Sequence, residues 1–185
     1  MIFTHNSHRK EKIMNIHNVK MIAGMAICAL CATSFAQLGE IGAEESSSKA
    51  DARVRRALES AGVKYSVDND GDYKVHWTLE GGRTHVVFVN SNTSRLGSME
   101  FRNVWAVAFI ADEVSANNLR ALLELNGKYK VGAWNLTKRN DGQFIAAFSI
   151  TVSANCTGQA LRTFTQVVAS TADEIENTVT KADKF

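Results

Sequence analysis

Three aspartates at alternate positions, Asp68, Asp70 and Asp72, surround a glycine and form the densest group of cation-ligand side chains in the sequence. An EF-hand calcium loop also requires glycine at its sixth position and glutamate at its twelfth. Counted from Asp68, those positions hold Tyr73 and Leu79, and the flanking segments alternate like strands. Because Asn, Asp and Gly tolerate left-handed backbone, the sequence favours a tight turn between two strands, with a weak cation site as the alternative.

Two histidines, His76 and His85, flank the pair Gly81-Gly82. A two-residue turn in which Glu80 pairs with Arg83 would place both histidines on the same face of a hairpin. Zinc requires three or four protein ligands, and the sequence places no third ligand beside them. We therefore interpret both as surface residues, and a hydrolase that uses either one with an unrecognised partner is a separate hypothesis.

Other catalytic patterns are missing from the sequence. It contains no nucleophile elbow and no glycine-rich phosphate loop. Cys28 and Cys31 form a C-x-x-C pair, but both lie in an apolar run, and the remaining thiol, Cys156, is expected to be a small, partly buried residue at a helix start. The sequence therefore predicts a protein that is not an enzyme, with no cofactor and no resident metal.

The N-terminal segment has the organisation of a secretory signal peptide. Basic residues and histidines precede an uncharged run, Met21 to Ala36, which ends in the small-x-small sequence Ser34-Phe35-Ala36. The run is short for a membrane span, which needs about 20 apolar residues. We expect cleavage after Ala36 and a periplasmic or secreted protein, with an uncleaved anchor as the alternative, whereas the start residue (Met1, Met14 or Met21) stays open.

The rest of the chain divides into a linker and one domain. Residues 37–49 are rich in Gly, Glu and Ser and predict a flexible linker, and residues 50–185 predict a single domain. The formal net charge is +2, but four basic residues precede Ala36, so the domain is close to neutral. This balance argues against a nucleic-acid partner and against a membrane partner beyond the signal segment.

Hydrophobic periodicity predicts an α+β fold, with an antiparallel sheet flanked by helices. Ser115 is a plausible N-cap, and Leu119, Leu122 and Leu123 form one apolar stripe after it. The segment Glu100 to Ala111 is apolar on both faces and predicts a central strand, with Trp105 in the sheet core. The predicted order is α-β-β-β(-β)-α-β-β-α, with helices at 51–61, 114–125 and 157–180 and strands at 65–67, 73–79, 84–90, 100–111, 131–136 and 144–152.

Five segments of this sequence resemble the YbjN family, which is described as a group of sensory transduction regulators: LESAGVKYSVDNDGDYKV, VFVNS, VWAVAF, LLELNGKYKVGAW and STADEIE. The likeness spans Val54 to Phe185. It implies the fold of type III secretion chaperones, whose members often dimerise and bind partner polypeptides on sheet or helix surfaces, and it supplies no catalytic residues. Those chaperones act in the cytosol, whereas this chain carries an export signal, so their function cannot be transferred with the fold.

The function predicted from these observations is non-catalytic binding of a protein partner, or of a second copy of the chain, in the cell envelope. Contact would occur on an exposed sheet face or strand edge, by strand addition or hydrophobic docking. Trp77, Trp134 and Phe144 are the candidate contact residues. The alternative is a calcium or small-ligand sensor that uses the turn from Asp68 to Asp72.

Overall fold

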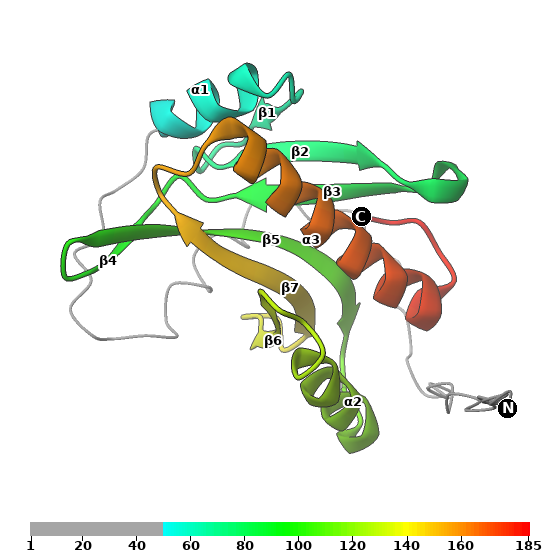
Figure 1. The fold of residues 1–185 in the computed structure, drawn as a ribbon. Helices are drawn as coiled ribbons and strands as arrows, with labels where there is room; N and C mark the ends of the chain where they lie inside the picture. Colours follow the sequence, from blue (N-terminus) through cyan, green and yellow to red (C-terminus); the bar gives the residue numbers. More distant parts are fainter. Residues whose placement is uncertain (1–49) are drawn as a thin grey trace, which may run out of the picture.

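A seven-stranded antiparallel sheet organises residues 50–185, the part of the chain that the computed structural model describes (Figure 1). The strand order is β1-β2-β3-β5-β7-β6, and β4 pairs with β5 outside this path. Long β5 lies between β3 and β7, as its two apolar faces predict. The strands are β1 (Ser66–Val67), β2 (Tyr73–Thr78), β3 (Thr84–Val89), β4 (Ser94–Leu96), β5 (Met99–Ala111), β6 (Ala133–Lys138) and β7 (Phe144–Ser153).

Three helices complete the described fold: α1 (Ala52–Ser60), α2 (Ala116–Asn126) and α3 (Gly158–Thr180). Each begins after a side chain that accepts a backbone N–H of the first turn, namely Asp51, Ser115 and Thr157. The predicted α+β class, the three helices and the Ser115 cap are confirmed. The predicted strands include none at the position of β4.

The main hydrophobic core lies between one face of the sheet and helices α1 and α3 (Figure 1). Its fully buried residues include Leu58 from α1, Val87 from β3, Phe148 from β7 and Val168 from α3. Helices α1 and α3 approach so closely that a Cβ added at Gly158 would lie 2.3 Å from the Ala57 carbonyl oxygen. A glycine at this position therefore permits the packing of the two helices.

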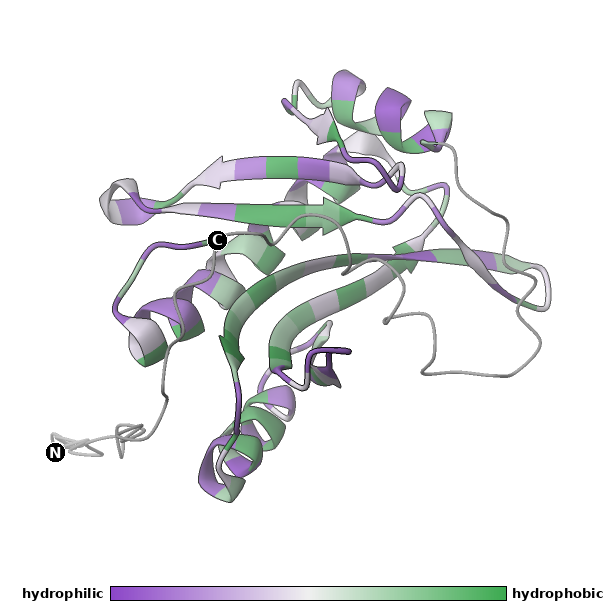
Figure 2. Ribbon diagram, turned by 180° about the vertical axis from the view of Figure 1, so that it is seen from behind, coloured by the Kyte–Doolittle hydropathy of each residue, from purple (hydrophilic) through white to green (hydrophobic). Residues whose placement is uncertain are grey.

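A second, smaller cluster lies on the other side of the sheet, where the apolar stretches of β5 and β7 run side by side (Figure 2). Trp105, Val107, Ile145 and Ala147 are buried there. Trp105 is thus buried as predicted, and its ring stacks on Phe88 with the centroids 4.5 Å apart.

The hairpin between β2 and β3 differs from the prediction by one residue. The Leu79 N–H donates to the Arg83 carbonyl oxygen at 2.8 Å, which encloses a three-residue turn, Glu80–Gly82. His85 consequently pairs with Trp77 instead of Thr78. Because a register shift of one residue exchanges the two faces of a strand, His76 and His85 lie on opposite faces, and the prediction that they share a face is wrong.

Candidate functional site

The aspartate segment forms the predicted turn. Asp68 accepts the backbone N–H groups of Asp70 and Asp72 through Oδ1, at 3.1 and 3.0 Å, and Gly71 has a φ of 90°. The Asp72 carboxylate faces inward and accepts the Ser91 N–H at 2.7 Å. The three carboxylates therefore do not form a group with converging ligand atoms in the described part of the chain.

Asp72 differs from its two neighbours in burial. It is buried, whereas the sequence predicted three solvated turn residues. Burial, which disfavours the charged carboxylate, raises the pKa of Asp72 to about 6. The Ser91 N–H partly offsets this effect because it stabilises the carboxylate.

A second group of polar side chains, the His85 cluster, consists of Arg83, His85, Asp173 and Glu176. Both His85 and Glu176 are 0 % exposed. The Arg83 guanidinium contacts Asp173 Oδ1 through Nε at 2.7 Å and Glu176 Oε2 through a terminal nitrogen at 3.3 Å. His85 Nδ1 lies 3.5 Å from Glu176 Oε2. No local sequence pattern indicates this cluster, because its members come from β3, α3 and the β2–β3 turn.

The residues after α3 fold back over the His85 cluster (Figure 1). Lys181 adopts a left-handed backbone with φ 56°, which ends the helix and reverses the chain. The Ala182 carbonyl then accepts a hydrogen bond from Arg83 at 2.8 Å, and the Lys184 N–H donates to Glu176 Oε1 at 2.6 Å. The Phe185 ring lies against His85, with the centroids 6.5 Å apart. The C-terminal segment thus encloses the cluster.

A third group, the Asp51 cluster, consists of Asp51, Arg53, Glu100 and Arg102. Arg102 is buried, and it donates to Asp51 at 2.6 Å and to the Asn90 carbonyl at 2.7 Å. Arg53 joins the cluster by pairing with Asp51 and Glu100 at 2.7 and 2.8 Å. Hydrogen bonds from Arg53 and Thr93 lower the pKa of Glu100 to about 2. The cluster ties the N-terminus of α1 to the base of β5.

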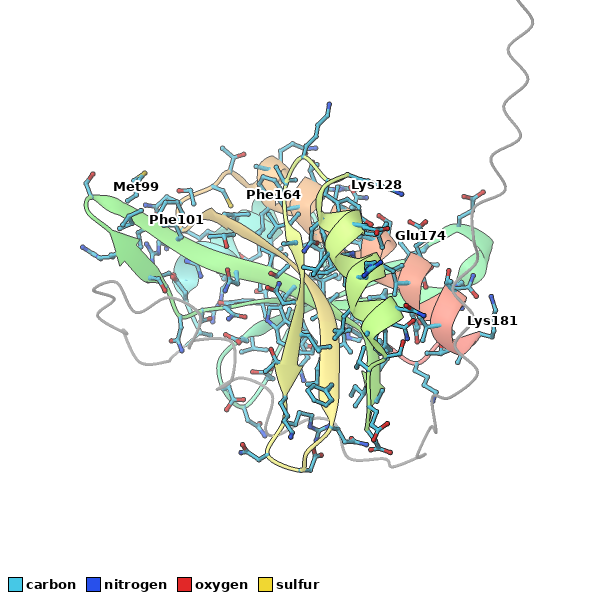
Figure 3. The ribbon with its side chains drawn as sticks, turned by 90° about the horizontal axis from the view of Figure 1, so that it is seen from below. Met99, Phe101, Lys128, Phe164, Glu174 and Lys181 are labelled. Carbon is cyan, nitrogen blue, oxygen red and sulfur yellow. The ribbon has the colours of Figure 1, made fainter. Side chains whose placement is uncertain are left out.

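The β4–β5 hairpin extends from this base and carries two exposed apolar residues. Leu96 and Met99 face each other across the hairpin and are 57 % and 53 % exposed. Figure 3 shows Met99 and Phe101 at the end of the hairpin, on the side of the molecule away from Lys181. An open groove of about 290 Å³ lies beside them, with Arg95 and Asn155 among its lining residues.

The three predicted contact residues lie in different environments. Trp134 is 5 % exposed and packs against Phe148 in the core, so the expectation of an exposed sheet position is wrong for it. Trp77 and Phe144 are half-buried, and Lys138 lies over the Phe144 ring at 5.5 Å. A contact role for Trp77 and Phe144 stays a prediction.

Two further expectations concern Cys156 and Leu123. Cys156 is half-buried just before α3, as expected, and burial raises its thiol pKa. Leu123 is exposed, so the predicted stripe of Leu119, Leu122 and Leu123 is wrong for this residue. Leu123 directly follows Leu122 in α2, so the two side chains point in different directions around the helix. Of the two, only Leu122 faces the core.

These features define the class of the protein as α+β, with one curved antiparallel sheet covered on one face by helices (Figure 1). A scan against protein families matches residues 50–181 to YbjN, described as "Putative bacterial sensory transduction regulator". The chain belongs to the YbjN family, as its sequence motifs indicated. Comparison with curated proteins and with solved structures gives no match.

The predicted signal peptide (1–36) and linker (37–49) lie outside the described residues. Within residues 50–185, no helix combines the length and apolar character that crossing a membrane requires. The family description fits a regulatory or chaperone-like role.

Proposed function

We propose that this protein binds a partner polypeptide in the cell envelope without catalysis, and that the β4–β5 hairpin is the main contact surface. The observation that carries this proposal is the pair Leu96 and Met99, which are directly opposed and more than half exposed. Large apolar side chains gathered at one exposed place are typical of protein-binding surfaces. The partner would contact this surface through an apolar segment.

The surroundings of this pair support a binding surface. Arg95 is exposed beside Leu96, and Asn155 borders the adjoining groove. An apolar centre with a polar rim is the usual composition of a protein interface. The Asp51 cluster holds the hairpin base through Glu100, which also accepts a hydrogen bond from Thr93 at 2.7 Å. A surface on a fixed hairpin loses little conformational entropy when a partner binds.

The state of the candidate catalytic groups supports a role without catalysis. The Cys156 thiol has a raised pKa, which disfavours the nucleophilic thiolate. Asp51 and Glu100 are paired with arginines, which hold the pKa of both carboxyls below the ordinary range. Neither carboxylate is therefore suited to general-base catalysis near neutral pH.

Export is the second part of the proposal, and the sequence of residues 1–36 is its support. The expected mature chain begins at Gln37. Mass spectrometry of the protein extracted from intact cells tests this directly, because cleavage after Ala36 fixes the mass of the mature chain. A full-length mass, together with a cytosolic location after cell fractionation, would contradict export.

Site-specific photocrosslinking tests the contact surface. A photoreactive phenylalanine derivative replaces Leu96 in the full chain, and the protein is captured with an antibody. A C-terminal tag is avoided because Phe185 packs against His85. We expect a defined adduct with one other protein after irradiation of intact cells, because Leu96 is central to the proposed surface.

The matched control places the same photoreactive residue at Val167, which is exposed on α3 and away from the hairpin. Adducts of equal yield from both positions would indicate random collisions and contradict the proposal. An adduct with the mass of two copies of this chain would show that the surface binds a second copy of the chain and not a different protein. With the photoreactive residue placed at Phe101 instead, the changes Leu96→Asp and Met99→Asp together should abolish the specific adduct, while circular dichroism stays unchanged.

A further inference from the structure

We propose that His85, Asp173 and Glu176 bind one divalent transition-metal ion, and that Zn²⁺ is the best match. This site is separate from the β4–β5 hairpin and does not depend on the proposed partner binding. The three side chains offer one nitrogen and two carboxylate oxygens, and these ligand atoms all lie within 4.8 Å of one another. They are the one such group in the described part of the chain.

The orientation of His85 is the first argument. His85 Nε2 lies 2.9 Å from the Val107 carbonyl oxygen, which can only accept a hydrogen bond. Nε2 therefore carries a proton, and Nδ1 is directed at Glu176. A metal-binding histidine typically has this arrangement, with one ring nitrogen on the metal and the other donating to a backbone carbonyl.

The environment of His85 Nδ1 is the second argument. This nitrogen is fully buried and makes no hydrogen bond within the described residues. Glu176 Oε2 lies 3.5 Å from this nitrogen, so one cation could contact both atoms. A cation at this place would give the buried nitrogen the partner that it lacks in the described residues.

The carboxylates are the third argument. Asp173 and Glu176 are three residues apart on α3 and thus lie on the same helix face. The Lys184 N–H fixes the Glu176 carboxylate through Oε1, which leaves Oε2 directed at His85. Zinc bonds of about 2.0–2.2 Å to nitrogen and oxygen would draw these three ligand atoms, which lie within 4.8 Å of one another, closer together. A nitrogen ligand also favours a transition metal over Ca²⁺ or Mg²⁺.

In the structure, the Arg83 guanidinium occupies the place between the carboxylates that the proposed metal ion would take. Its guanidinium contacts both proposed carboxylate ligands and also lies 4.0 Å from Asp183. Three carboxylates thus share this one guanidinium, and a divalent ion would supply them with a second positively charged partner. When the metal binds, Arg83 can turn toward Asp183, which lies in the C-terminal segment. Binding would therefore compete with the contacts of Arg83 to Asp173 and Glu176.

Isothermal titration of the full chain with Zn²⁺ tests the proposal. The chain carries Cys28→Ser and Cys31→Ser, so that these thiols do not bind the metal. We expect one equivalent to bind at the proposed site. Glu176→Gln should weaken that binding at least about tenfold, since even residues that only orient a ligand have effects of 10- to 100-fold. His85→Ala should have the same effect if circular dichroism shows that it folds.

Glu174→Gln and His76→Ala are the matched controls. Glu174 lies on the exposed side of α3 (Figure 3), and His76 is exposed on the opposite face of the hairpin from His85. Neither change should alter the affinity. Zinc binding that is equally strong in the Glu176→Gln variant and in these controls would assign the metal to another part of the chain and overturn the proposal.

Arg83→Gln gives an independent readout. Because this change removes the competing guanidinium, the variant should bind Zn²⁺ severalfold more tightly than the unchanged chain. A cluster that serves only as an ion-pair network would bind no metal in either protein. Absence of one-equivalent binding in both the unchanged chain and the folded Arg83→Gln variant would overturn the proposal.

Discussion

The Asp51 cluster lies where α1 begins and the His85 cluster lies toward the end of α3, on opposite sides of the domain (Figure 1). The two clusters differ in charge balance. In the Asp51 cluster, two guanidinium groups face two carboxylates. In the His85 cluster, Arg83 is shared by Asp173, Glu176 and Asp183.

This difference separates a structural role from a binding role. Burial of a charge is unfavourable unless a partner compensates it. The Asp51 cluster provides this compensation internally, and it fixes α1 and the β4–β5 hairpin. The His85 cluster has an excess of carboxylates and a buried nitrogen without a hydrogen bond, and it is therefore the better candidate for an external cation.

Removal of Arg102 should have the largest effect on stability. In Arg102→Met the half-buried Asp51 side chain loses one of its two arginines, and the Asn90 and Ala154 carbonyls lose a donor. Loss of one partner of a buried pair costs about 3 kcal/mol. Urea unfolding measures the change, with Arg95→Met on the exposed hairpin as control. A loss as small as that of the control would show that the Asp51 cluster is not structural.

Removal of the Asp72 charge should stabilise the fold at neutral pH. The pKa of Asp72 is about 6 in the folded protein, and an unfolded aspartate titrates near 3.9. Between these two pKa values the folded state binds more protons than the unfolded state. The free energy of unfolding therefore decreases as pH rises from about 4 to 6, and it stays lower above that range. Asp72→Asn keeps the acceptor for the Ser91 N–H and removes this loss.

The expected gain for Asp72→Asn is about 2 kcal/mol at pH 8, and no gain is expected at pH 3.5. Urea unfolding at both pH values measures it, and Asp70→Asn, at an exposed position of the same turn, is the control. A gain of equal size at pH 3.5 would show that charge burial is not its cause.

Two matched changes, each from a carboxylate to an amide, compare the contributions of the two clusters to folding stability. Their expected effects are the smallest of these predictions. Glu100→Gln should cost about 1.5 kcal/mol because it weakens charged hydrogen bonds from Arg53. Glu176→Gln, measured with a chelator present, should cost less, because the amide oxygen still accepts the Lys184 N–H and Arg83 keeps Asp173 as a partner. Unfolding curves of both variants give the comparison, and equal losses would remove the distinction between the clusters.

Local signals predicted the elements of the fold. The Ser115 cap and the period-two segments before and after the aspartate turn were recognisable in the sequence. These features depend on residues that are neighbours in the chain. The prediction for the aspartates succeeded for the turn but missed the burial of Asp72, because its contact Ser91 lies in a distant segment.

The candidate sites were less predictable because they depend on register and packing. One additional residue in the Glu80–Gly82 turn moved His85 to the face that α3 covers. The expectation that Trp134 is exposed failed because α2 and the adjoining loop cover it, and Asn126 of α2 bonds both its backbone N–H and its carbonyl. A strand pattern indicates two faces but does not identify which face a distant helix will cover.

The sequence by itself therefore determined the order of the helices and the longer strands, the Ser115 cap and the family, since short-range sterics, hydrogen bonds and periodicity govern them. Only the tertiary structure decided which charged side chains meet. The approach of Asp173 and Glu176 to His85 depends on the rotation of α3 about its axis, which the burial of Val168 and Ala172 against the sheet sets. Such packing joins residues from distant segments, and no local pattern specifies it.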